Sequence, residues 1–325
     1  MWALWLSPTW LPTVTAAEEL GLFDRLSDGN PATAEQIAAA LELSPRATRA
    51  MLGLLSALGL LQLHASAFAL TETARTYLVS SSPYYWGPAL MPHKMMPMSH
   101  GQILEALKGD RAAAPTDAAA MWKAPDPMVL RMFTSVMHAH SLPTASALAR
   151  DAAFAQTKRL LDVGGGSGAY ASCLALRNPS LQCTVLELPA MKAITDDYLA
   201  AIATNGRVKS HAADMFVDAW PTGHDAVFFN DVFHDWPAAQ CQLLARKAFD
   251  ALPSKGTVFI HEMLLDEGLD GPLPAAAYSM LMLVSTPGRQ LSGKEVVDLL
   301  SAAGFTDVKA VPSVGHYSLV SGLKP

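Results

Sequence analysis

Charged residues are scarce in this 325-residue chain: they make up 16% of the sequence and leave a formal net charge of −6. A protein that holds nucleic acid phosphates or an anionic membrane without regard to sequence needs a surplus of basic residues, so the charge disfavours both partners. Cysteine is scarce too. Cys173, Cys183 and Cys241 have neither close pairing nor the spacing of a metal site, which is typical of core thiols in a reducing compartment. We therefore expect a small or medium-sized apolar ligand.

Long hydrophobic runs and an amino-terminal positive charge are also missing. The apolar run from Met51 to Leu61 is far short of the roughly 18 residues that span a bilayer, and glycines interrupt it. The apolar start, Met1 to Leu6, has no basic residue before Arg25, so it lacks the positive flank of a signal peptide. These absences predict a soluble, cytoplasmic protein. With 51% hydrophobic residues the chain can bury a large core, and its length suggests about two domains.

Residues 1–95 are predicted to form a small helical domain. Thr33 and Gln36 have the spacing of a capping box, which starts a short helix because each side chain satisfies a free backbone N–H. The stretch 44–58 has the start and stop signals of a further helix, and two strands with a short turn are predicted over 60–70. Three helices followed by a hairpin indicate a winged helix.

Charge decides between two functions of such a domain. A winged helix is typical of DNA-binding proteins, but residues 1–90 carry four arginines against seven acidic residues. That surface would repel phosphates. The leucine-rich and alanine-rich helices favour a dimerisation domain, with DNA binding as the alternative.

Residues 96–150 are predicted to be a helical connector rich in methionine, aromatic and histidine residues. Methionine fills adaptable apolar pockets, and ligand sites often lie between domains, so these residues line a pocket or simply form core. His138 and His140 suggest a metal site, but positions two apart on a helix point in different directions. A third ligand would have to come from His234 or Asp235, so we predict no metal.

After Lys158 the pattern changes to short apolar strands separated by helix-length segments. The predicted strands are 159–163, 182–187, 207–211, 225–230 and 256–262. Two further runs, 305–311 and 316–320, have no helix-length gap between them, so they should form an antiparallel hairpin at the sheet edge. The predicted fold class is therefore α/β, with a doubly wound, Rossmann-like sheet in residues 151–325.

The first of these strands ends in a glycine-rich turn, which reads Asp162-Val163-Gly164-Gly165-Gly166-Ser167-Gly168. Glycines without Cβ atoms let a ligand approach the backbone, and the start of the next helix offers free N–H groups. Gly164, Gly166 and Ala169 also fit the looser dinucleotide pattern. The turn alone therefore predicts a nucleotide or nucleoside site without naming the cofactor.

Two acidic residues extend this site. Glu187 ends the second strand, where its carboxylate can accept hydrogen bonds from both ribose hydroxyls. Asp214 follows the third strand and can accept from the exocyclic amine of adenine, with Met215 against the ring. A solvated turn is the alternative for Asp214.

A histidine stands just beyond the fourth strand, in the run Asn230-Asp231-Val232-Phe233-His234-Asp235-Trp236. Ligands bind at this carboxyl edge in open α/β sheets, and histidine titrates near neutrality, so His234 is the predicted general base for a phenol or enol. Asp235 is expected to cap the following helix. Glu262 closes the fifth strand and can fix the tautomer of His234, while His261 faces the other side of the sheet.

Together these motifs resemble the family of plant and bacterial small-molecule O-methyltransferases, which includes caffeic acid, acetylserotonin and antibiotic-tailoring enzymes. The resemblance covers nearly the whole chain. It is carried by Ala16-Ala17-Glu18-Glu19-Leu20-Gly21-Leu22-Phe23, Leu161 to Gly168, Glu187-Leu188-Pro189, Asp214-Met215-Phe216, His234-Asp235-Trp236 and Ala303-Gly304-Phe305.

The resemblance implies a homodimer joined through its winged-helix half, with S-adenosylmethionine on the C-terminal half. It implies methyl transfer to a hydroxyl of an aromatic or polyketide-like small molecule, with His234 as base and Glu262 as its supporting acid. The predicted cofactor contacts are Gly164, Gly166, Glu187, Asp214, Met215, Asn230, Trp236 and Ser141. The predicted acceptor contacts are Phe133, Met137, Trp122 and Gln290.

One departure concerns a second supporting carboxylate. The family often has a glutamate near Gly288, whereas this chain reads Gly288-Arg289-Gln290-Leu291-Ser292. Gln290 can hydrogen-bond His234 but adds no charge, so the basicity of His234 should depend more heavily on Glu262. Carbon or nitrogen methylation, a protein that binds the cofactor without methyl transfer, and a nicotinamide dehydrogenase remain the alternatives.

Overall fold

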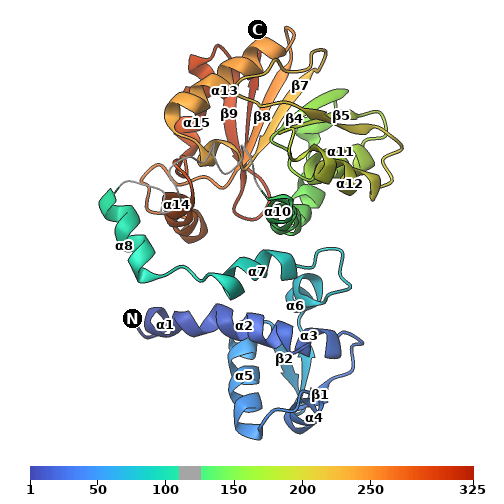
Figure 1. Cartoon of the computed structure of the whole chain (residues 1–325), viewed down its shortest axis with the longest axis vertical. Coiled ribbons are helices and arrows are strands. Elements are labelled where there is room, and N and C mark those ends of the chain that lie inside the picture. The colour runs from blue at the N-terminus through green and yellow to red at the C-terminus, as the bar shows by residue number, and fades with distance from the viewer. Residues whose placement is uncertain (110–125) are drawn as a thin grey trace. The chain divides into compact units, whose positions relative to one another are not determined.

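The computed structural model describes residues 1–109 and 126–325. The chain divides into two compact units, Met1–Met98 and Ser99–Pro325, and each is described by itself (Figure 1). In residues 1–109 and 126–325, no helix is both long and apolar enough to cross a membrane.

The first unit combines helices with a small antiparallel sheet of strand order β1-β3-β2. Its elements are α1 (Trp2–Leu6), η1 (Ser7–Thr9), α2 (Trp10–Glu19), α3 (Leu22–Arg25), β1 (Ala32–Thr33), α4 (Ala34–Ala40), α5 (Pro45–Ala57), β2 (Leu61–His64), β3 (Ala67–Leu70), α6 (Glu72–Leu78) and α7 (Gly87–Met95). Buried leucines and Phe23 form its core. The winged-helix pattern is confirmed.

Local signals in the sequence set the boundaries of these elements. The Thr33 hydroxyl accepts from the Gln36 N–H while the Gln36 side chain accepts from the Thr33 N–H, which is the predicted capping box. The hairpin turn contains two residues, Ala65 and Ser66, both with positive φ, as its tight geometry requires. Strand β1 was not predicted, because two residues are too few to show a pattern.

The second unit is built on one seven-stranded sheet of order β6-β5-β4-β7-β8-β10-β9. Its strands are β4 (Arg159–Val163), β5 (Gln182–Glu187), β6 (Val208–Ala212), β7 (Ala226–Asn230), β8 (Thr257–Glu262), β9 (Thr306–Pro312) and β10 (Ser318–Leu323). Strands β4 to β8 are parallel, and β9 and β10 form the predicted antiparallel hairpin at the edge. The doubly wound α/β class is confirmed.

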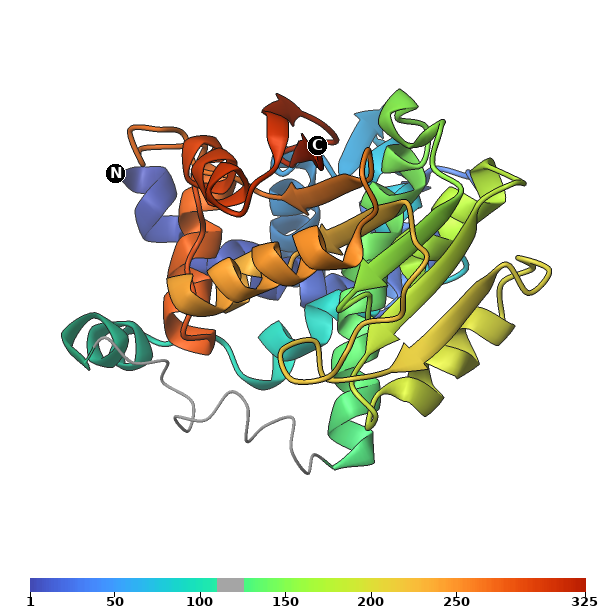
Figure 2. The same cartoon turned by 90° about the horizontal axis from the view of Figure 1, so that it is seen from above.

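Helices cover both faces of this sheet (Figures 1 and 2). The helices of this unit are α8 (His100–Gly109), α10 (Pro127–Leu148), η2 (Ala152–Phe154), α11 (Ala169–Arg177), α12 (Lys192–Ala200), η3 (Phe233–Asp235), α13 (Ala238–Ala251), α14 (Leu273–Ser285) and α15 (Gly293–Ala302). Because neighbouring strand residues point to opposite faces, Leu160 packs with α10 and α11, whereas Leu161 packs with α13 and α15.

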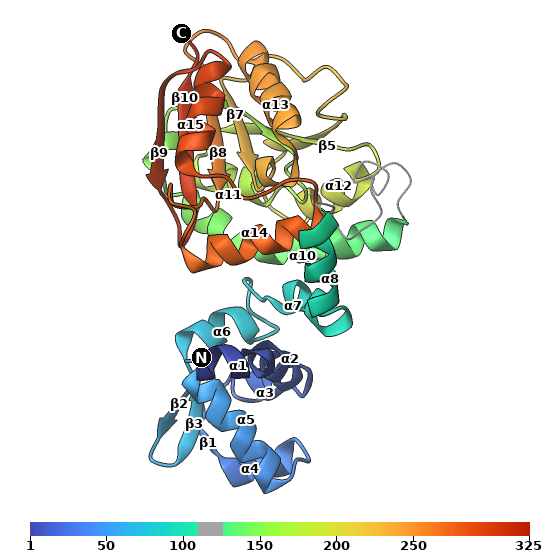
Figure 3. The ribbon, with the colours of Figure 1, turned by 90° about the vertical axis from the view of Figure 1, so that its left-hand side faces the viewer.

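The order of the strands locates the functional edge. Strand β4 lies between β5 and β7, so the chain leaves β4 on one side and returns to its other side later. Ligands of doubly wound sheets bind at the carboxyl ends of the strands at this reversal. The residues that follow β4 and β7 are the glycine-rich turn and the His234 segment. Figure 3 shows α10 and α14 at one end of the same sheet.

Removing a core side chain tests this layered packing. Leu161→Ala, on the buried α13 face, should lower the free energy of unfolding by about 2 to 5 kcal/mol, because it leaves a cavity beside Val163 and Val227. Urea unfolding of the full chain measures the change. Leu176→Ala, at an exposed position of α11, is the matched control and should change it by less than about 0.5 kcal/mol. Equal effects of the two substitutions would contradict the assignment of Leu161 to the core.

Candidate active site

Three glycines give the turn after β4 its shape. Gly164, Gly166 and Gly168 all adopt the left-handed backbone conformation, with φ of 68°, 57° and 72°. A Cβ at Gly168 would come within 2.6 Å of Leu199, so this glycine is needed for packing. A Cβ at Gly166 would meet nothing within 4 Å. The turn is therefore packed at its end and open at its centre, where a ligand can approach the backbone.

Glu187 and Met215 flank this open turn. The Glu187 carboxylate accepts from the Gly166 N–H at 2.9 Å and from the Leu188 N–H at 2.8 Å, and burial raises its pKa. The Met215 sulfur lies 4.0 Å from where a Cβ of Gly164 would stand. The structure thus brings together an acidic side chain, a thioether and open backbone, as a nucleoside cofactor requires.

Asp214 and Trp236 lie beside this group. Asp214 accepts a 2.8 Å hydrogen bond from the Phe216 N–H, so in this structure its carboxylate closes its own turn. Trp236 packs edge-on against Phe216, with ring centroids 4.6 Å apart. Adenine contacts at Asp214 and Trp236 therefore remain predictions.

Helix α10 carries three of the predicted contacts. Ser141 is buried. His138 lies one helical turn before Ser141, and its Nδ1 is 2.8 Å from the Ser167 hydroxyl of the glycine turn. Ser141 is therefore on the face of α10 that meets this turn. Phe133 is 39% exposed and Met137 is half-buried. Trp122 lies outside the described residues.

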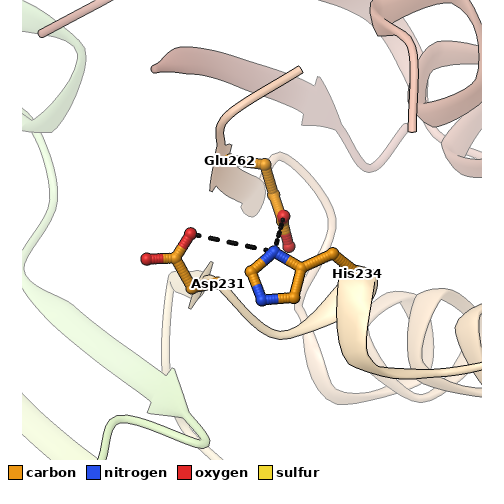
Figure 4. Close-up of side chains that lie close together, drawn as sticks. All are labelled: Asp231, His234 and Glu262. Atoms are coloured by element: carbon orange, nitrogen blue, oxygen red, sulfur yellow. Dashed lines mark ion pairs between the residues drawn. The ribbon is translucent and has the colours of Figure 1, made fainter. Parts of the chain in front are cut away.

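His234 is held at the carboxyl edge by Glu262, as predicted from their strand positions (Figure 4). Its Nδ1 lies 2.9 Å from Glu262 Oε2, off the direction of a straight hydrogen bond, and its side chain is 3% exposed. The other Glu262 oxygen accepts from the backbone N–H groups of Val232 and Phe233, at 3.1 and 2.8 Å. Glu262 therefore cannot turn away from the ring without losing two buried hydrogen bonds.

Two further carboxylates surround His234, although the sequence predicted that its basicity would depend mainly on Glu262. Asp231 Oδ1 lies 3.9 Å from Nδ1, and Asp235 Oδ1 lies 3.6 Å from Nε2. The sequence pattern did not single out Asp231. Asp231 precedes the N-cap of η3 and has a left-handed backbone, so helical spacing does not predict its approach to His234.

Two expected contacts are replaced by others. Asp235 does not cap α13, because Pro237 occupies the N-cap position and Asp235 ends the preceding 3₁₀ turn. The predicted hydrogen bond from Gln290 to His234 is replaced as well: the buried Gln290 amide donates to the Met263 carbonyl at 2.9 Å. Its role in acceptor binding remains a prediction.

Asn230 belongs to a hydrogen-bond network next to the His234 segment. Its amide donates to Asp231 Oδ2 at 2.9 Å, and its carbonyl oxygen lies 2.7 Å from His261 Nδ1. His261 is fully buried on the other face of the sheet, as predicted, and stacks on Tyr317. A cofactor contact of Asn230 remains a prediction.

Opposing effects set the protonation of His234. Burial alone would lower its pKa, but the charges of Glu262, Asp235 and Asp231 outweigh burial and raise the pKa to about 10. These charges therefore favour the protonated imidazole in the protein without ligands.

Asp231, His234 and Glu262 also have the composition of a cation site, with ligand atoms within 4.8 Å of one another. Their hydrogen bonds fit a metal poorly. One oxygen of each carboxylate is already taken by two donors. A cation on Nδ1 would also move the ring proton to Nε2, the nitrogen that a general base needs free. The geometry therefore favours a cluster that holds a proton.

Comparison with known proteins agrees with this geometry. Residues 116–306 match the O-methyltransferase domain, and residues 11–80 match the O-methyltransferase dimerisation domain. The chain belongs to the O-methyltransferase family. The enzyme is therefore an S-adenosylmethionine-dependent methyltransferase, and the residues around Gly166 fit this cofactor.

Individual relatives span nearly the whole enzyme. It is 36% identical to the 3-hydroxy-5-methyl-1-naphthoate 3-O-methyltransferase of Streptomyces sahachiroi, over 96% of this chain and 91% of that one. It is 30% identical to the acetylserotonin O-methyltransferase of Bos taurus, over 95% and 92%. The crystal structure of human N-acetylserotonin methyltransferase in complex with S-adenosylmethionine superimposes with a TM-score of 0.81 at 25% identity, covering 97% of this chain and 93% of that one.

A buried carboxyl at the start of the glycine turn yields a stability prediction. Asp162 is 1% exposed, its Oδ2 has no hydrogen-bond partner, and burial raises its pKa to about 7. Because the folded-state pKa lies above the unfolded value, ionisation costs stability as the pH rises from about 4 to 7. Asp162→Asn removes this cost.

We expect Asp162→Asn to stabilise the ligand-free enzyme more at pH 8 than at pH 5, by up to a few kcal/mol. Thermal unfolding at both pH values measures this. Asp250→Asn, at an exposed position of α13, is the control and should show no pH-dependent gain. An equal effect of Asp162→Asn at both pH values would show that the Asp162 carboxyl ionises freely in the folded enzyme.

Proposed function

We propose that this enzyme methylates a hydroxyl of an aromatic or polyketide-like small molecule, with His234 as the general base. The observation that carries the proposal is the Nδ1 contact between the buried His234 and the anchored Glu262, at the sheet edge where the glycine turn lies. The relatives that act on a hydroxynaphthoate and on acetylserotonin support this class of acceptor.

The cofactor site supports this chemistry. S-adenosylmethionine, when bound, supplies an electrophilic methyl group. Gly164 and Gly166 would leave room for it, Glu187 would accept from its ribose, and Met215 would pack against its base. Val232 lies 3.2 Å from the Cβ position of Gly164, two residues before His234, which joins the cofactor site to the base along the chain.

His234 would act through Nε2, because Nδ1 already lies 2.9 Å from Glu262 Oε2. The acceptor O–H bond breaks as its proton passes to Nε2, and the oxygen forms a bond to the methyl carbon as the carbon–sulfur bond breaks. The imidazolium that results keeps its Nδ1–H towards Glu262, whose negative charge stabilises it. Tyr278 of α14 holds the ring in place, with centroids 5.1 Å apart and planes at 70°.

The apolar character of α10 supports an apolar acceptor. Phe133 and Met137 lie four residues apart on one face of this helix, so together they present an adaptable hydrophobic surface. We assign the acceptor to this face.

The first unit is proposed to join two copies of the enzyme. It matches the dimerisation domain, and its amino-terminal helices expose large apolar side chains: Trp2, Leu4, Trp5, Trp10 and Leu11. Light scattering of the full chain should give twice the monomer mass of 34.6 kDa. The free cysteines Cys173, Cys183 and Cys241 support a reducing, cytoplasmic location.

Substitution of the base tests the mechanism. His234→Gln should lower kcat by about 10² to 10⁴-fold, because the acceptor loses its proton acceptor, while calorimetry should find S-adenosylmethionine affinity nearly unchanged. Screening phenolic and polyketide compounds with a labelled methyl group supplies the acceptor and shows which atom is methylated. His64→Gln, at an exposed site of β2, is the control. Near-normal turnover of His234→Gln would exclude His234 as the base.

The charge around His234 predicts a pH profile. Because its pKa is raised in the ligand-free enzyme, the neutral imidazole becomes abundant only at alkaline pH, so kcat/KM should keep rising above pH 8 rather than level off near 6.5. Glu262→Gln removes a raising charge and should move this rise to lower pH while lowering kcat. The measurement is kcat/KM between pH 6 and 10. A wild-type rise centred at or below pH 6.5 would contradict the prediction.

A further inference from the structure

Asp231 occupies an unusual position directly after β7. Its φ is +51°, a left-handed conformation that aspartate tolerates better than most residues, and its N–H donates to the His261 carbonyl at 3.2 Å. The side chain is 2% exposed. A buried carboxylate on a left-handed residue carries two costs, which the surrounding structure must offset.

One oxygen of this carboxylate is fixed by two neighbours. Asp231 Oδ2 accepts from the Tyr317 hydroxyl at 3.0 Å and from the Asn230 amide at 2.9 Å. Both neighbours are themselves anchored on His261: Asn230 through a 2.7 Å hydrogen bond, and Tyr317 by stacking at 4.7 Å. Residues of β7 and β8, together with the residue before β10, therefore hold the Asp231 carboxylate in one orientation.

This anchoring directs the other oxygen at the base. Asp231 Oδ1 has no hydrogen-bond partner among the residues that the structure describes, and it lies 3.9 Å from His234 Nδ1, which is buried as well. Figure 4 shows Nδ1 between the carboxylates of Asp231 and Glu262. A buried, unpaired carboxylate oxygen is costly unless a positive charge faces it.

The groups that face the cluster come from every surrounding element. Glu262 belongs to β8. Asp235 ends η3 and lies beside Nε2 of His234. Tyr278 of α14 contacts the His234 ring. The charged or titratable groups around Asp231 itself are Tyr317 before β10, Tyr170 of α11 and His140 of α10. The imidazolium of His234 is the cation that directly faces both Asp231 and Glu262.

We propose that Asp231 is a positioning residue for the methyl transfer reaction, which holds His234 Nδ1–H jointly with Glu262 and stabilises the imidazolium formed when Nε2 takes the acceptor proton. The proposal rests on His234 as the base. The proton leaves the acceptor oxygen for Nε2, and the Nδ1 proton stays where it is. Asp231 changes neither its bonds nor its protonation, so its contribution is charge and orientation.

This role would replace the acid that is missing at Gln290. Gln290 is neutral and hydrogen-bonded to the Met263 carbonyl, so it supplies no charge to the ring. Asp231 supplies a second charge on the Nδ1 side from β7 instead. Two carboxylates that face one ring nitrogen restrict rotation of the ring better than one and leave Nε2 as the reactive nitrogen.

The test compares Asp231→Asn with wild type. The amide preserves shape and its contact with Tyr317 but removes the charge, so we expect kcat to fall at least tenfold and the alkaline rise of kcat/KM to move to lower pH. The S-adenosylmethionine dissociation constant and the acceptor KM should change less than about threefold. Asp250→Asn, at an exposed position of α13, is the matched control and should change none of these quantities.

Tyr317→Phe provides a second test that keeps the carboxylate. Loss of the hydroxyl frees Asp231 Oδ2 from one donor, so kcat should fall by a smaller factor, and Asp231→Glu should recover part of the pH profile lost in Asp231→Asn. If Asp231→Asn leaves the pH profile unmoved while His234→Gln abolishes turnover, Asp231 has only a structural role. The inference about Asp231 then fails, while the proposal that His234 is the base stands. Near-normal turnover of His234→Gln would overturn the base itself. If Asp231→Asn does not fold, an unmoved pH profile in Tyr317→Phe overturns the inference.

Discussion

The contact between His234 and Glu262 is the interaction on which the active site depends. Both groups are buried, so each would be unfavourable without the other. Glu262 is in turn fixed by the backbone N–H groups of Val232 and Phe233, which lie in the segment that carries His234. His234 and Glu262 are therefore held against one another by the strand ends of β7 and β8.

The same strand ends place the proposed cofactor site close to the His234 segment. The glycine turn follows β4, and β4 pairs with β7, so the open backbone at Gly166 and the histidine segment leave neighbouring strands in the same direction. A parallel sheet gives this arrangement without special contacts, because the carboxyl ends of neighbouring strands share one edge. Glu187 and Met215 are the side chains beside this open backbone.

Much of this arrangement was predictable from the sequence, because its signals are local. The boundaries of β4 and β5 matched the prediction, and the capping box at Thr33 formed, since each depends on neighbouring residues. The positions of His234 and Glu262 followed from the rule that both end parallel strands. Asp231 escaped prediction because its effect depends on a left-handed backbone and on Tyr317, 86 residues further along the chain. The partner of Gln290 escaped for a similar reason: a backbone carbonyl of a distant residue leaves no pattern in the sequence.

The position of Tyr317 has a consequence for how the enzyme matures. Strand β10 comes last in the chain among the seven strands of this sheet, yet it is inserted between β8 and β9, and Tyr317 directly precedes it. During synthesis, β4 to β8 emerge from the ribosome before the residue that fixes Asp231. A nascent chain therefore completes the surroundings of His234 only when the final hairpin docks, so the order of translation sets when this buried cluster can form.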